Sequence, residues 1–276
     1  MRGAVSGGMG LALDELGLAD RFDAAYGSSA GALNAMWLIS GRAQDGIHTW
    51  TDADLGKEFV SKRRIFGERP IVDMKTLIEQ HYERISPGLF DAVLAADTEF
   101  RPLATDIETG SAVDLGPMIN DRESLQLAIR ATSTLPLIGG PPIEFGGRRY
   151  LDAGLSAAIP FRAAIEDGAT HILVLRSRKV GHVASDPTGM SGRVTSRLLR
   201  RISPAAANGY LTRGQREGED ERFLSRYDSE TDLEPSILSI RPPLDSPVPS
   251  RLESDMDLVR AGLEAGRQAA HQVLDS

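Results

Sequence analysis

The sequence contains no cysteine, which excludes disulfides, thiolate catalysis, cysteine-bound zinc and iron–sulfur clusters. Its five histidines are scattered and show neither HxH nor HExxH spacing, so we expect no histidine metal site. No apolar run reaches the roughly 18–20 residues that cross a bilayer. The first ten residues lack the basic and apolar regions of a signal peptide. These absences predict a cytoplasmic globular protein.

The composition is that of a folded, acidic protein. Of the 276 residues, 41% are hydrophobic, and 31 basic against 39 acidic side chains give a net charge of −8. A chain of this length can hold one large hydrophobic core or two small ones. The acidic balance argues against a general nucleic-acid-binding surface, and we expect no nucleic-acid partner.

Short apolar segments alternate with helical patterns along the chain, which favours an α/β sheet with helices on both faces. Residues 42–100 are expected to be mainly helical. The charged segments 176–201 and 217–234 lack strong periodicity and are expected to be solvated surface or loop. The remaining predicted helices span 8–18, 30–39, 121–131, 160–167 and 255–274, and the predicted strands span 22–26, 100–107, 143–145, 148–151, 171–175 and 237–240.

The clearest chemical motif is Gly27-Ser28-Ser29-Ala30-Gly31, which lies between a predicted strand and a predicted helix. A sharp strand-to-helix turn holds the central serine in a strained conformation, and the two glycines let neighbouring segments approach closely. Ser29 then lies at a helix N-terminus, which favours the negative charge of an alkoxide or oxyanion. The motif predicts a nucleophile at Ser29. The alternative is that Ser28 or Ser29 is an ordinary helix cap.

A nucleophilic serine needs a base, and the sequence offers two kinds. His171 and His182 are the downstream histidines near a predicted strand, and a structural role is the simpler interpretation of His171. Asp152 ends a predicted strand and is followed by the small residues Ala153 and Gly154. A carboxylate in a dry site, hydrogen-bonded to the serine, can accept its proton. We expect Asp152 to be the base, with a turn or cap residue as the alternative.

These two motifs together resemble the patatin-like phospholipase family and its bacterial members, which carry a Ser–Asp dyad on a modified α/β-hydrolase-like sheet. The resemblance covers residues 1–176 well. It implies a three-layer α/β/α sandwich, with 1–176 as the patatin-like domain and 177–276 as a helical C-terminal extension packed on it. The segments that carry the resemblance are 27–31, 103–110, 130–133, 152–154 and 159–164.

The resemblance also implies a function. It is that of a serine lipid acyl hydrolase of the phospholipase, lysophospholipase or esterase type, acting on a fatty-acyl ester without a metal or other cofactor. Ser29 would be acylated, and Asp152 would act as base and then as acid. One alternative is a non-catalytic lipid-binding or structural relic. Another is an enzyme that transfers the acyl group to an alcohol.

The sequence departs from the family pattern at two places. Ala153 stands where the family has glycine, which would be strained if that position needs a positive φ. The glycine-rich loop whose N–H groups form the oxyanion hole is represented only by its last positions, so Arg2, Gly3 and Ala30 are the candidate oxyanion residues. We expect the DNA upstream to encode about 8–15 further residues with a strand and a glycine run, and the strand at 22–26 to have one open side.

Two basic segments are candidates for peripheral contact with an anionic membrane surface. One is 62–66, where three cations precede an isoleucine and a phenylalanine. The alternative for both is a solvated helix face. The second segment combines four arginines with three apolar residues: Arg193, Arg197, Leu198, Leu199, Arg200, Arg201 and Ile202.

Overall fold

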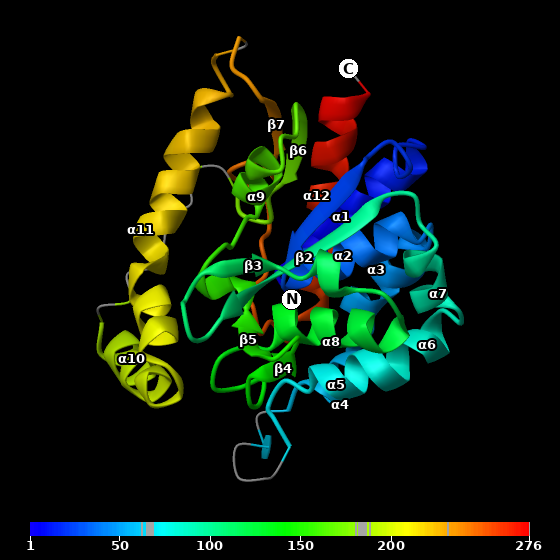
Figure 1. Ribbon diagram of the computed structural model, residues 1–276. Helices are drawn as coiled ribbons and strands as arrows, with labels where there is room; N and C mark the ends of the chain where they lie inside the picture. Colours follow the sequence, from blue (N-terminus) through cyan, green and yellow to red (C-terminus); the bar gives the residue numbers. More distant parts are fainter. Residues whose placement is uncertain are drawn as a thin grey trace.

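The fold is a mixed α/β structure with strands in the middle and helices on both sides (Figure 1). The computed structural model describes residues 1–61, 63–64, 69–179, 181, 187, 189–230 and 232–275. The predicted α/β class is therefore confirmed. The main sheet has the order β1 (Ala24–Ser28), β2 (Glu99–Asp106), β5 (Arg148–Asp152) and β4 (Ile143–Phe145), with β3 (Ala112–Asp114) beside β2.

A second, two-stranded sheet consists of β6 (His171–Leu175) and β7 (Ser236–Ile240), which pair in parallel. In the main sheet, β1 runs parallel to β2 and pairs with no other strand among the described residues. The first strand thus has one open edge, as the sequence predicted. Residues of β1 and β6 line the same large cavity, so this edge faces β6 across open space.

The first layer of helices contains α1 (Gly3–Glu15) and α12 (Met256–Leu274), which pack tightly on each other. A Cβ atom at Gly8 would lie 1.9 Å from the carbonyl oxygen of Leu263, and one at Gly266 would lie 2.0 Å from that of Val5. Glycine normally weakens a helix, but here it permits this close contact. The first helix begins at Gly3, five residues before the predicted segment 8–18, and ends at Glu15.

Helices α2 (Ala30–Ile39) and α8 (Arg122–Ser133) complete this layer against the main sheet. The carboxylate of Asp121 accepts the N–H of Ser124 at the start of α8, so an acidic cap opens this helix. The described part of segment 42–100 is mainly helical, as predicted. Its helices are α3 (Ala43–Thr51), α4 (Ala53–Phe59), α5 (Met74–Thr76), a π-helical turn (Leu77–His81), α6 (Tyr82–Ile85) and α7 (Leu89–Leu94).

The other side carries α9 (Phe161–Glu166), α10 (Met190–Ile202) and the long α11 (Pro204–Arg226), which runs along one flank of the molecule (Figure 1). Of the two expectations for 176–201 and 217–234, loop is wrong, because both contain helix, whereas solvated surface agrees with the mostly exposed or half-buried side chains of these helices. Helix α11 fully buries few residues, all small or apolar, and forms ion pairs through Glu217 and Asp220 on its surface. Such a helix gives almost no hydrophobic periodicity to detect.

Among the described residues, no helix combines the length and the apolar character that crossing a membrane requires.

Candidate active site

Ser29 forms the turn between β1 and α2, with φ 54° and ψ −122°. L-residues rarely adopt this region, and Ser29 and Leu137 are the only non-glycine residues with positive φ in the described part of the chain. The side chain of Ser29 does not cap α2. Its hydroxyl is therefore not an ordinary helix cap, and the turn has the strained backbone that the motif predicted.

The two glycines of the motif differ in what they do. A Cβ atom at Gly27 would lie 2.3 Å from Cα of Ala32, so only glycine fits where β1 and α2 approach each other. Around Gly31, no heavy atom lies within 4 Å of such a Cβ. The expected close approach is confirmed at Gly27 and wrong at Gly31.

Neighbouring polar groups fix the turn and distinguish its two serines. The hydroxyl of Ser28 donates to the carbonyl oxygen of Ala157 at 2.7 Å, which ties it to a second loop. The N–H of Ser29 donates to the hydroxyl of Thr132 at 2.9 Å. Thr132 was not among the predicted site residues, although segment 130–133 carried part of the family resemblance. These bonds leave the hydroxyl of Ser29 as the one available for chemistry in this turn.

Asp152 ends β5 and is only 4% exposed. Its Oδ1 accepts the N–H of Gly154 at 2.8 Å, whereas Oδ2 has no hydrogen bond of regular geometry to any described residue. Burial raises the pKa of this carboxyl, and the nearby hydroxyl of Ser29, the Gly154 amide and the charge of Arg251 counteract part of that rise in pKa. The fold thus brings Ser29 and Asp152 together, although they are far apart in the sequence.

Asp106, another buried carboxylate at a strand end, has the opposite environment. Its oxygens accept the amides of Glu108 and Thr109 and a 2.6 Å bond from Arg148. These interactions hold the pKa of Asp106 below its ordinary value in spite of burial. Asp106 therefore stabilises a turn as a fully paired anion, while Asp152 keeps an oxygen free for a proton.

The N-termini of α1 and α2 meet beside the serine. A Cβ atom at Gly3 would lie 2.5 Å from Cβ of Ala30, so the first residues of the two helices are in contact. The first amides of a helix have no partner within it, and the helix dipole favours negative charge there. Arg2 directly precedes α1. The structure thus groups the three predicted oxyanion residues at one place.

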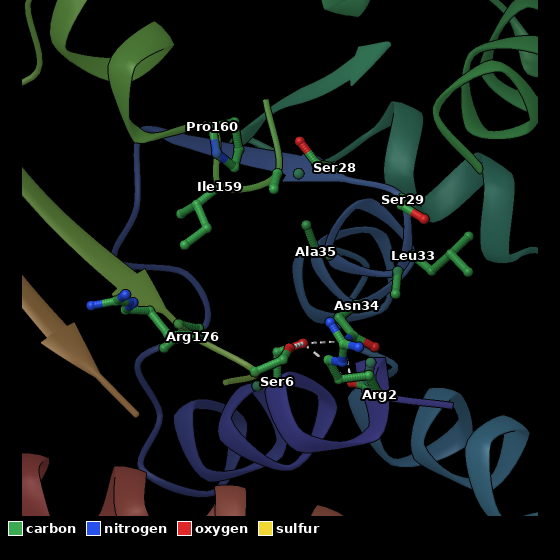
Figure 2. Close-up of a pocket in the computed structure, with 18 of the residues that line it drawn as sticks. Arg2, Ser6, Ser28, Ser29, Leu33, Asn34, Ala35, Ile159, Pro160 and Arg176 are labelled. Atoms are coloured by element: carbon green, nitrogen blue, oxygen red, sulfur yellow. Dashed lines mark hydrogen bonds between the residues drawn. The ribbon is translucent and has the colours of Figure 1, made fainter. Parts of the chain in front are cut away.

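A cavity of about 2190 Å³ lies in front of these groups, between β1 and β6. Figure 2 shows Ser29 where β1 joins α2, with apolar side chains of α2 and of the segment before α9 around the open space. On the floor of the cavity, the amide of Asn34 donates to the hydroxyl of Ser6 and to the carbonyl oxygen of Gly3, both at 2.9 Å. The labelled apolar residues that line it are Leu33, Ala35, Ile159 and Pro160.

The two candidate histidines do not lie with the serine and aspartate. His171 is exposed on β6, on the far side of the cavity, with Nδ1 at 3.1 Å from the hydroxyl of Thr170. His182 lies outside the described residues. Within the part of the chain that the structure describes, no three His, Asp or Glu side chains are grouped so that they could hold a metal ion.

Residues 1–165, more than half of the chain, match the family model described as patatin-like phospholipase. The chain belongs to this family. A search of curated proteins gave no match. At the level of the family, membership supports hydrolysis of lipid acyl esters. Ser29 and Asp152 of this patatin-like protein both lie inside the matched segment, whereas β6, β7 and helices α10 to α12 lie beyond it.

One expected departure from the patatin-like pattern has no structural cost. Ala153 is fully buried at the start of a short 3-10 turn that follows Asp152, and it is not among the residues with positive φ. The condition for strain is therefore not met, and alanine fits this position.

Proposed function

We propose that this patatin-like protein is a serine lipid acyl hydrolase in which Ser29 is the nucleophile and Asp152 the general base. One observation supports this most. The hydroxyl of Ser29, whose backbone is strained, lies next to a buried carboxylate whose Oδ2 has no other described partner. A raised pKa makes Asp152 a stronger base than an exposed carboxylate, because the proton it accepts removes a buried charge.

In the acylation step, Oγ of Ser29 attacks the ester carbonyl carbon as its proton passes to Asp152. The carbonyl oxygen becomes an oxyanion at the adjoining N-termini of α1 and α2, where Gly3 and Ala30 begin the helices and Arg2 adds a positive charge. When the tetrahedral intermediate collapses, the ester C–O bond breaks and Asp152 returns its proton to the leaving alcohol.

Deacylation follows the same order of steps, with water as the nucleophile. Asp152 takes a proton from a water molecule as its oxygen attacks the acyl carbon, and a second oxyanion forms at the same helix N-termini. The bond to Oγ then breaks, Ser29 regains its proton from Asp152, and the fatty acid leaves. The cavity of about 2190 Å³ exceeds the roughly 300–1,000 Å³ of common small-molecule pockets, so it can receive a long acyl chain.

Covalent labelling tests this proposal. A fluorophosphonate probe should label the wild-type protein at Ser29, as identified by peptide mass spectrometry, because the probe requires an activated serine and an oxyanion site. Asp152→Asn should label much more slowly. Complete absence of labelling would favour the non-catalytic relic.

The same enzyme could pass its acyl group to an alcohol instead of water. Products formed from a lipid ester in the presence of glycerol distinguish these two reactions. Free fatty acid as the main product is expected for a hydrolase, and acylglycerol as the main product would instead identify an acyltransferase.

We further propose that α10 contacts the membrane surface. Met190, Val194 and Leu198 are 85%, 55% and 39% exposed, and a spacing of four places them on one helix face. Leu199 is fully buried and does not belong to this surface, contrary to the sequence-based expectation. Exposed arginines on the same helix suit an anionic surface. They are Arg193, Arg197, Arg200 and Arg201.

The other basic candidate, 62–66, offers less support. Lys62, Ile65 and Phe66 lie outside the described residues. The guanidinium of Arg64 donates to the carbonyl oxygens of Glu58 and Phe59, so this side chain has a structural role.

Val194→Glu should weaken co-sedimentation with phosphatidylglycerol-containing vesicles about tenfold or more, because it removes apolar burial and adds repulsion from the lipid charge. Leu244→Glu is the matched control, since Leu244 is also exposed, at 64%, but lies on a different segment. Equal losses for the two variants would contradict a specific role of α10. Hydrolysis of a soluble short-chain ester should stay unchanged in both.

A further inference from the structure

Four arginines from four separate segments gather around the start of α1. Arg2 precedes that helix, Arg178 follows β6, Arg213 lies on α11, and Arg251 precedes α12. Burial and then the positive charges of Arg178, Arg251 and Arg213 lower the pKa of Arg2 to about 10. Repulsion of this kind means that the guanidinium groups are close enough to act on one another.

Contacts of α11 place Arg213 near the turn that follows Asp152. Gly209 packs against Leu155, with a built Cβ 3.1 Å from its carbonyl oxygen, and Arg216 donates to that same oxygen. Arg213 is four residues after Gly209 and three before Arg216, so it lies on the same face of the helix. The ring of Tyr210, 4.3 Å away, packs against its guanidinium.

Arg251 approaches the same turn from the other side. Its carbonyl oxygen accepts the amino group of Met1, and its Nη2 lies 3.9 Å from a Cβ built at Gly154. The positive charge of Arg251 also lowers the pKa of Asp152. Arg2 and Arg251 line the same cavity as Ser29 and Asp152. Together with Arg178, these arginines are therefore part of the cavity wall beside the dyad, while Arg213 lies on α11 next to the turn that follows Asp152.

The nearby carboxylates neutralise this cluster only in part: the charge of Glu217 raises the pKa of Arg2, but by less than Arg178 or Arg251 lowers it. Glu217 accepts two hydrogen bonds, at 2.5 and 2.9 Å, from Arg178. Glu253 accepts hydrogen bonds from the hydroxyl of Ser250 and from backbone amides of residues 250, 254 and 255. Among the described residues, no carboxylate forms an ion pair with Arg2, Arg213 or Arg251. Three like charges grouped without counter-ions are unfavourable unless an anion from outside binds among them.

We propose that Arg2, Arg213 and Arg251 bind the phosphate of an anionic phospholipid head group, so that the enzyme selects lipids with a phosphomonoester or another net negative charge. This inference rests on the proposed hydrolase function and specifies its substrate. Planar guanidinium groups match phosphate oxygens in paired hydrogen bonds. Because Arg251 is exposed and Asp152 is buried, the anion site extends from Arg2, at the start of α1 beside the dyad, outward to Arg251. Two of the three arginines come from the C-terminal part beyond residue 165, which the family match does not cover.

The test compares dihexanoyl phosphatidic acid, dihexanoyl phosphatidylcholine and p-nitrophenyl butyrate, all used as soluble monomers so that vesicle binding plays no part. Wild-type protein should have a higher kcat/KM for the phosphatidic acid than for the phosphatidylcholine. Arg213→Gln and Arg251→Gln should each lower that ratio about tenfold or more. Arg226→Gln is the matched control on the same helix, because Arg226 pairs with Glu230 and lies away from the cluster. It should leave the ratio unchanged.

Lipid binding measured on a catalytically inactive variant tests the anion site independently of the proposed catalysis. Ser29→Ala protein should bind dihexanoyl phosphatidic acid in a calorimetric titration, and adding Arg213→Gln should weaken that binding about tenfold or more. Competition by inorganic phosphate would show that the phosphate itself is recognised, while its failure to compete would show that the lipid chain is required as well. An unchanged selectivity ratio in both arginine variants, or unchanged binding in the double variant, would overturn the anion site. Failure of p-nitrophenyl butyrate hydrolysis by wild-type protein would count against the hydrolase instead.

Discussion

Replacing Ser29 with alanine is expected to reduce the hydrolysis of p-nitrophenyl butyrate by about 10⁴-fold or more, because the acyl-enzyme can no longer form. Alanine keeps the Cβ atom, so the backbone strain at φ 54° stays the same and the unfolding temperature should change little. Initial rates and thermal denaturation followed by circular dichroism measure the two effects on the same preparations.

Ser28→Ala is the matched control for this variant. Ser28 donates to the carbonyl oxygen of Ala157, so its loss leaves a partly buried acceptor unpaired and should cost about 1 kcal/mol of stability. Most of the activity should remain, because this hydroxyl points to another loop. A larger loss of activity in Ser28→Ala than in Ser29→Ala would refute the assignment of the nucleophile.

Asp152→Asn is expected to lower kcat by at least about 100-fold, because the amide cannot take the proton of Ser29. Asparagine retains an oxygen that can accept the Gly154 N–H, so the turn should be preserved. Burial raises the folded-state pKa of Asp152 above its ordinary value of 3.8. The stabilisation that Asp152 gives the wild-type protein is therefore fully present below the pKa that Asp152 has in the unfolded chain. It is lost as the pH rises through the pKa of Asp152 in the folded protein. At neutral pH the variant should unfold at the same temperature as wild type or higher.

The activity of the wild-type protein should also depend on the ionisation of Asp152. Since the base works as the carboxylate, kcat/KM should rise with pH, and the midpoint of the rise should lie above the ordinary value of 3.8. Asp152→Asn should lack this rise. A flat profile in wild-type protein across the acid range would contradict a buried carboxylate as the base.

Two side chains serve as controls for the choice of base. Asp106→Asn should affect stability more than rate, because Asp106 is a paired anion whose lowered pKa contributes stability above its unfolded pKa that is lost as the pH falls through the folded pKa. His171→Ala should retain activity, since His171 is exposed on β6. The dyad would be the wrong assignment if either variant lost as much activity as Asp152→Asn.

The sequence predicted the local elements of the site well, since short patterns determine them. The structure has α2 at Ala30–Ile39, the same bounds as predicted, and β1 within two residues of its expected position. Gly27 could be assigned a steric role because a strand that turns directly into a helix leaves no room for a side chain. Asp152 could be identified as the carboxylate that ends a strand.

Contacts between distant segments could not be predicted in this way. Nothing in the sequence brings Arg213 and Arg251 to the turn that follows Asp152, because each stands in a polar segment without periodicity. Helix α11 was missed for the same physical reason, since ion pairs stabilise parts of its surface where an apolar face would otherwise give a pattern. Thr132 and its bond to the Ser29 amide depend on how α8 packs against the turn.

The positive φ of Ser29 lowers the stability of the folded protein at the residue that its activity requires. A serine in such a conformation costs about 1–3 kcal/mol, whereas glycine adopts it almost freely. Among single substitutions at this position, the one that relieves the backbone also removes the nucleophile. Laboratory evolution that rewards only heat resistance would therefore enrich inactive glycine variants, and a programme to stabilise the protein has to retain those clones that still turn over an ester.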